Sequence, residues 1–174
     1  MKYQLLPVFL ILIFMFTGCD NNDPVSNGDS ENYIEVVTGD VTENNYYYNL
    51  ITESEDTTTW HVSYENVDAG GGYNMPTVRL NNTIMLEIYT AQEFNDIQSI
   101  PDDLNYSDDL IGCEYGHTEV IINEILHYDP GSYIMSVSNP STVYICYDTV
   151  THGVFKIQFV EYNSGILLFR FDQL

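Results

Sequence analysis

The pattern that most restricts the fold is a series of short apolar and β-branched segments separated by tight turns. Near the C-terminus, Thr142–Tyr147, Val154–Tyr162 and Ile166–Phe171 have the lengths and composition of strands. Asp148–Gly153 and Asn163–Gly165 join them, which predicts hairpins. This succession predicts an all-β fold, an antiparallel sandwich or curved meander of many short strands.

Further strand-like segments precede this series. They are Tyr33–Val37, Asn45–Ile51, Thr57–Tyr64, Pro76–Leu80, Thr83–Tyr89 and Ser132–Val137. The glycines of Gly70–Gly72 predict a mobile or tightly folded loop, because glycine holds a regular strand poorly. Thr90 and Glu93 have capping-box spacing, which predicts one short helix over Ala91–Ile97. Glu119–Tyr128 fits either a strand or a short helix.

The N-terminus has the pattern of a secretory signal that ends in a lipidated cysteine. Leu5–Phe16 is uncharged but shorter than the roughly 20 residues that span a bilayer as a helix. Thr17 and Gly18 are small and precede Cys19, as in a lipobox. We expect a signal peptide over residues 1–18 and a diacylglycerol on the cysteine thiol. An ordinary cleaved signal or a membrane anchor is the alternative.

The residues after Cys19 indicate a linker followed by one domain. Asp20–Asn32 is polar, acidic and poor in apolar residues, which is typical of a flexible tether. We therefore expect a lipidated cysteine with its linker over residues 19–32 and a single β domain over residues 33–174. The expected location is the outer membrane, with the lipid-anchored domain facing the cell surface or the periplasm.

The charge of the chain excludes two classes of partner. The sequence has 26 acidic residues against 4 lysines and arginines, a formal net charge of −22. Such a chain repels nucleic acid and anionic membrane surfaces, so membrane contact is expected only through the lipid anchor. We interpret the acidic composition as an adaptation for solubility in a salty medium. The alternative interpretation is that the acidic residues form a binding site.

The motifs of enzymes and zinc sites are missing from the sequence. It has no GxSxG motif and no cysteine in a cationic setting, so we expect no enzyme activity. Cys113 and Cys146 remain after Cys19, and an exported location permits a disulfide between them. A buried free thiol at Cys146 is the open alternative.

Several segments occur in the order and spacing of a known family. They are YYYNLI (Tyr46–Ile51), WHVSY (Trp60–Tyr64), Gly70–Gly72, MPTVRLN (Met75–Asn81), Thr90–Asp109, Val143–Tyr162 and LLFRF (Leu167–Phe171). Through them the chain resembles the HmuY family of haem-binding lipoproteins of Bacteroidetes-like bacteria; His61 departs from the family, where an acid is usual. The resemblance implies an all-β fold that holds haem between loops by axial His or Met ligation. It also implies delivery of haem to an outer-membrane receptor of the TonB-dependent type.

Haem iron requires imidazole or thioether ligands in an apolar slot. The candidates in the sequence are His61, His117, His127, His152, Met75, Met85 and Met135. We favour three of them: His117 in an accessible loop, His127 at the end of an apolar segment, and Met135, near which the resemblance implies a second ligand.

Two other functions remain open from the sequence. A β-sandwich surface lipoprotein could bind a glycan or another protein without haem. Four carboxylates in one acidic loop, Asp102, Asp103, Asp108 and Asp109, could bind Ca²⁺, although no EF-hand pattern is present.

Overall fold

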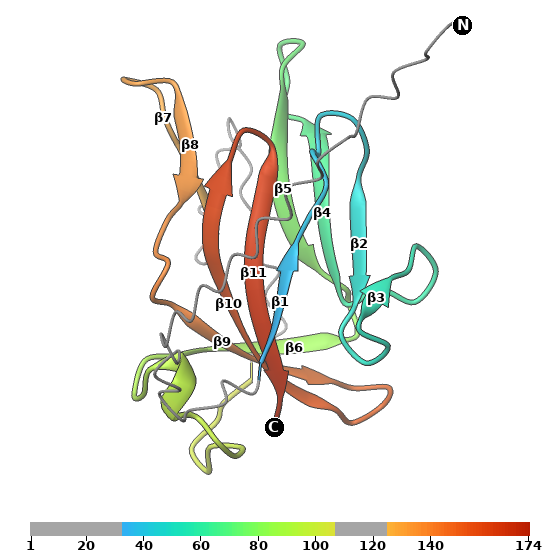
Figure 1. Cartoon of the computed structure of the whole chain (residues 1–174), viewed down its shortest axis with the longest axis vertical. Helices are drawn as coiled ribbons and strands as arrows, with labels where there is room; N and C mark the ends of the chain where they lie inside the picture. Colours follow the sequence, from blue (N-terminus) through green and yellow to red (C-terminus); the bar gives the residue numbers. More distant parts are fainter. Residues whose placement is uncertain (1–32, 107–124) are drawn as a thin grey trace, which may run out of the picture. The chain divides into compact units, whose positions relative to one another are not determined.

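Two antiparallel sheets face each other across a shared core, and a separate hairpin lies beside them (Figure 1). The computed structural model describes residues 33–106 and 125–174. Residues 31–174 form one compact unit. The prediction of an all-β antiparallel fold is confirmed.

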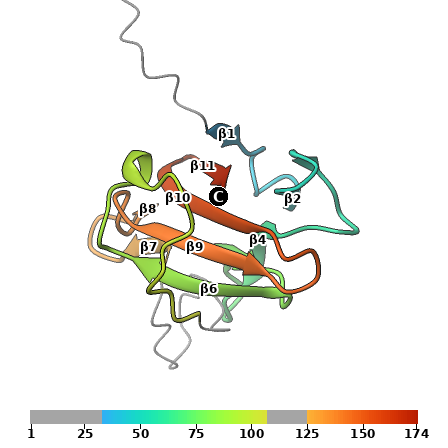
Figure 2. The ribbon, with the colours of Figure 1, turned by 90° about the horizontal axis from the view of Figure 1, so that it is seen from below.

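The first sheet has five strands in the order β1-β11-β10-β9-β6. Their bounds are β1 Ile34–Val37, β6 Ile84–Tyr89, β9 Val143–Asp148, β10 Val154–Asn163 and β11 Ile166–Gln173. All neighbours are antiparallel, and β10 has an irregularity of register between Phe159 and Glu161. Figure 2 shows β9 lying between β6 and β10.

The second sheet has four strands in the order β3-β2-β4-β5. They are β2 Tyr46–Asn49, β3 Ser54–Glu55, β4 Val62–Asp68 and β5 Asn74–Leu80. The remaining hairpin pairs β7 (Leu126–Asp129) with β8 (Ile134–Val137). In this hairpin, β8 contacts β10 and β7 contacts β5.

Alternation along the strands builds the core between the two sheets. On β11, Leu167, Phe169 and Phe171 are buried, whereas the residues between them are less so. Tyr48 of the second sheet meets Phe169 and Phe171 edge to face, with ring centroids 5.7 Å apart in both pairs. Aromatic pairs of this geometry add to the stabilisation from burial alone. The core thus joins strands far apart in the sequence.

A second apolar cluster covers part of the outer face of the first sheet. Phe94 and Ile97 are each 1% exposed and pack with Val143, Ile145 and Val154. These strand residues alternate with core residues, so they lie on the opposite face of the sheet.

The expected helix over Ala91–Ile97 is wrong in extent and type. The structure has one 3₁₀ turn, η1 (Phe94–Asp96), and no side chain caps it. The reason is tertiary: Lys156 Nζ donates a hydrogen bond to the Ile97 carbonyl at 2.7 Å and lies 4.7 Å from the centroid of the Phe94 ring. These contacts require both residues to face the sheet, and they override the local capping signal.

Other segments differ from expectation mainly at their ends. The segment expected over Thr57–Tyr64 becomes a strand only at Val62, because the Asp56 carboxylate accepts hydrogen bonds from the Thr58 and Thr59 amides and closes a turn. Of Glu119–Tyr128, the described end begins strand β7. The expected signal peptide, Cys19 and the linker lie outside the described residues. Within residues 33–106 and 125–174, no helix is both long enough and apolar enough to cross a membrane.

Candidate functional site

A cleft lies between the β4–β5 hairpin and the β7–β8 hairpin, which project at the same end of the domain (Figure 1). We call it the hairpin cleft. One part has a volume of about 560 Å³ and is lined by Ala69, Gly70, Tyr73, Asn74, Met75, Tyr128, Pro130 and Tyr133. The adjoining part, of about 450 Å³, shares Met75, Tyr128 and Tyr133 and adds Pro76, Ile134, Met135, Tyr162, Asn163 and Ser164.

The tip of the β4–β5 hairpin depends on its three glycines. Gly70, Gly71 and Gly72 have φ angles of 90°, 64° and 84°, a region that side-chain-bearing residues rarely adopt. The Asp68 carboxylate accepts a hydrogen bond from the Gly70 amide at 2.8 Å. This turn returns the chain at Tyr73, whose ring is 74% exposed at the mouth of the cleft. The structure thus has a tight turn here, one of the two conformations that the sequence left open.

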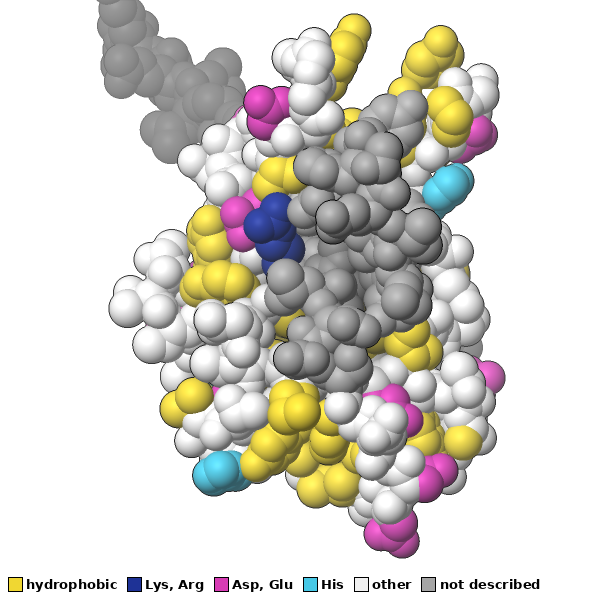
Figure 3. All heavy atoms as spheres, turned by 180° about the vertical axis from the view of Figure 1, so that it is seen from behind, with side chains coloured by type: hydrophobic (Ala, Val, Ile, Leu, Met, Phe, Trp, Pro, Cys, Tyr) yellow, Lys and Arg dark blue, Asp and Glu magenta, His cyan; other side chains and the backbone are white. Residues whose placement is uncertain are grey.

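The tip of the β7–β8 hairpin is fixed by an aspartate. Asp129 accepts hydrogen bonds from the Gly131 amide at 2.8 Å and from the Ser132 hydroxyl at 2.6 Å. The hydrogen bond from Ser132 contributes most to lowering the pKa of Asp129, and the one from Gly131 adds to it. Tyr133 follows with φ 60° and is 80% exposed. Each hairpin therefore presents one tyrosine at its tip, and Figure 3 shows hydrophobic side chains at both projections.

Two methionines from different hairpins line the same part of the cleft. Met75 lies on β5 and is 9% exposed. Met135 lies on β8, is half-buried, and packs against the main core. Their thioethers are the soft donor groups of a site whose other lining residues include four tyrosines, Tyr73, Tyr128, Tyr133 and Tyr162. The residues that line the cleft in the described part of the chain include no Lys, Arg, Asp or Glu.

The structure separates His127 from Met135. Met135 is the cross-strand partner of Tyr128, and both line the cleft. His127 precedes Tyr128 and pairs with Ser136, so it lies on the opposite face of the hairpin, where it is exposed. His117, the third favoured ligand, lies outside the described residues.

His61 is buried between the sheets and is engaged on both ring nitrogens. Its Nδ1 accepts a hydrogen bond from the Leu50 amide at 3.1 Å, and its Nε2 lies 3.5 Å from the Asp148 carboxylate. Burial lowers the pKa of His61, and the nearby Asp148 carboxylate partly offsets this. A neutral ring held in this way has no nitrogen left for an iron atom.

Among the remaining predicted site residues, those that the structure describes lie apart from the cleft. Asp102 and Asp103 are in the loop after η1, whereas Asp108, Asp109 and Cys113 lie outside the described residues. Cys146 is buried in the main core, and burial raises the pKa of its thiol. No group of three or more His, Cys, Asp or Glu side chains that could hold a metal occurs in the described part of the chain.

Sequence reasoning considered Met75 without favouring it and did not select the tyrosines of the cleft. The sequence does contain a signal for these tyrosines, because each lies next to residues that favour a turn. Gly70–Gly72 precede Tyr73, and Pro130-Gly131 lie between Tyr128 and Tyr133. No protein-family model, curated protein or solved structure matches the chain.

Proposed function

We propose that the chain is a lipid-anchored, extracytoplasmic haem-binding protein of the HmuY type. It captures haem in the hairpin cleft by axial thioether ligation and passes it to an outer-membrane receptor of the TonB-dependent type. It catalyses no reaction. The observation that carries the proposal is the placement of Met75 and Met135 in one cleft with tyrosine walls.

The chemistry of the cleft fits a haem better than it fits a bare metal ion. Thioether sulfur is a known axial ligand of haem iron, and tyrosine rings provide flat, largely apolar walls for the macrocycle. The volumes of the two parts of the cleft fall within the usual range of about 300–1,000 Å³ for ligand sites. Since none of the described residues that line the cleft is a cation, the haem propionates would extend toward solvent.

A spectroscopic titration of residues 20–174 tests the proposal. We expect a shifted Soret band at micromolar haem under oxidising or reducing conditions. Met75→Leu and Met135→Leu keep the apolar volume but remove the sulfur, so each should weaken binding and change the spectrum. His127→Ala is the matched control and should change neither. Absence of a shifted band, or unchanged spectra in both methionine variants, contradicts the proposal.

A second function is favoured by the exposed rings at the two tips. Tyr73 and Tyr133 expose most of their surface, and exposed aromatic rings are common anchors for sugars and protein partners. In this alternative, the cleft binds a glycan or a protein and no haem. Tyr73→Ala and Tyr133→Ala would then abolish retention on a glycan array, whereas the methionine variants would not.

A further inference from the structure

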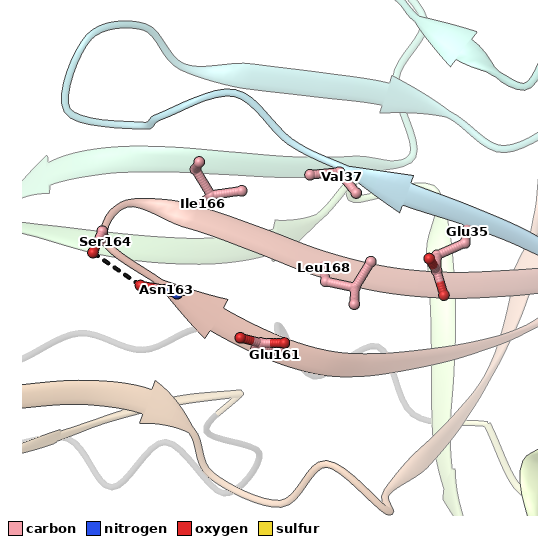
Figure 4. A pocket seen from close by; sticks show the side chains of 7 residues that line it. All are labelled: Glu35, Val37, Glu161, Asn163, Ser164, Ile166 and Leu168. Atoms are coloured by element: carbon pink, nitrogen blue, oxygen red, sulfur yellow. Dashed lines mark hydrogen bonds between the residues drawn. The ribbon is translucent and has the colours of Figure 1, made fainter.

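The outer face of the first sheet carries an exposed apolar strip near the turn between β10 and β11. Its floor is formed by Val37 of β1 with Ile166 and Leu168 of β11, as Figure 4 shows. Val37 is 63% exposed and Ile166 is 39% exposed. The hollow has a volume of about 450 Å³, and its remaining lining residues are Glu35, Glu161, Asn163 and Ser164.

The same face is covered where the sheet continues past the strip. In the register of β1 and β11, Val37 is opposite Leu168 and Glu35 is opposite Arg170. Arg170 lies beneath the apolar cover, with its guanidinium carbon 4.5 Å from the Phe94 ring centroid. The solvent-facing side of an antiparallel sheet is usually polar, so a bare aliphatic strip next to a covered one is unusual.

The charged residues around the strip indicate the charge that a partner should carry. Glu35 and Glu161 are exposed, and neither forms an ion pair with any other described residue. Arg170, across from Glu35, is engaged by the ring contact and by a hydrogen bond that it donates to Gln158 at 2.7 Å. The strip therefore combines an apolar floor with two carboxylates that form no ion pair among the described residues, because the nearby Arg170 is engaged elsewhere.

We propose that this strip docks an extended segment of a partner protein whose apolar side chains are flanked by lysine or arginine. β1 is an edge strand of its sheet, so an extended segment can lie alongside the strip. A second copy of the chain fits poorly, because carboxylates would meet carboxylates between molecules of net charge −22. The chain's own residues 20–32 are acidic and fit poorly for the same reason.

The strip and the hairpin cleft share the turn between β10 and β11. Asn163 and Ser164 line both hollows. A partner on the strip therefore touches residues that also border the cleft. A role for docking in the transfer of haem rests on the proposed function. Docking of the partner segment on the strip does not depend on haem binding.

Fluorescence anisotropy with the full chain in detergent tests the docking surface. The probe is a labelled peptide of alternating valine and threonine with lysines at both ends, and the matched peptide carries glutamates instead. We expect the lysine peptide to bind more tightly. The Glu35→Lys/Glu161→Lys variant should weaken its binding by about tenfold and should reverse the preference. Glu43→Lys/Glu55→Lys makes the same change in net charge at exposed positions elsewhere and should preserve the preference.

Three results would overturn the proposal. They are equal binding of the two peptides, an equal loss of binding in the control variant, and concentration-dependent self-association that the strip variant abolishes. Val37→Asn should also weaken binding of the lysine peptide, since it removes part of the apolar floor without changing the charge. Unchanged binding in this variant would contradict docking on the strip. Haem titration of the strip variant should match wild type, so failure of docking and failure of haem binding are distinguishable.

Discussion

Gly165→Ala should destabilise the domain, because the added Cβ would clash with the side chain of Asp40. Gly165 has φ 87°, and a Cβ built there would stand 2.2 Å from Asp40 Oδ1. Asp40 cannot move freely, because the same oxygen accepts hydrogen bonds from the Thr42 amide at 2.9 Å and the Thr42 hydroxyl at 2.7 Å. The Gly165 carbonyl also accepts hydrogen bonds from Val41 and Tyr64, which fix the glycine in place.

The expected magnitude has two parts. The left-handed backbone costs a side-chain-bearing residue about 1–2 kcal/mol, and displacing Asp40 adds to this. Gly72→Ala is the matched control, because Gly72 has φ 84° and its Cβ would meet nothing within 4 Å. We expect Gly72→Ala to cost only the backbone part, which lowers Tm by about 2–4 °C per kcal/mol in a domain of this size.

Urea denaturation of both variants measures the difference. Gly165→Ala should lose clearly more unfolding free energy than Gly72→Ala. In an Asp40→Ala background, the added loss from Gly165→Ala should fall to that of the control. Equal losses at the two glycines, or an unchanged loss after Asp40 is removed, would refute the clash as the cause.

Three further outcomes follow from buried groups. Because burial lowers the pKa of His61, the unfolded chain takes up a proton first, and stability should fall as the pH drops below about 6.5. In thermal melts across this range, His61→Gln should flatten the fall, and an unchanged pH dependence would contradict this role of His61. Phe94→Ala should cost about 3–5 kcal/mol in urea denaturation, since the ring is buried and packs against the cations of Lys156 and Arg170; a loss below about 1 kcal/mol would contradict this packing. In residues 20–174 carrying Cys113→Ser, Cys146 should react with a thiol reagent only on unfolding, and rapid native labelling would show that it is accessible.

The strands were predictable because their signals are local. Alternation over Ile166–Phe171 and the turn at Asn163–Gly165 are visible in the sequence, and the structure has β11 and its hairpin there. The helix prediction failed where a local signal competed with distant contacts. The capping-box spacing of Thr90 and Glu93 cannot reveal that Lys156 holds the following residues against a sheet.

The candidate site was only partly predictable, for the same reason. Met135 was favoured from the sequence, and it lines the cleft. Met75 became its counterpart only because two hairpins distant in sequence project at one end of the domain. His127 and Met135 lie on opposite faces of the β7–β8 hairpin. This follows from the register of the two strands, which the sequence does not show. Lipidation of Cys19 and a disulfide from Cys113 to Cys146 stay predictions.

The most direct test of the central proposal is proton NMR of the ferrous haem complex. A methionine that ligates low-spin haem places its terminal methyl group over the macrocycle, where the ring current shifts its resonance far upfield. We expect two such methyl resonances, one lost in Met75→Leu and the other in Met135→Leu. A haem complex without upfield methyl resonances, or with both retained in the two variants, would contradict thioether capture in the hairpin cleft.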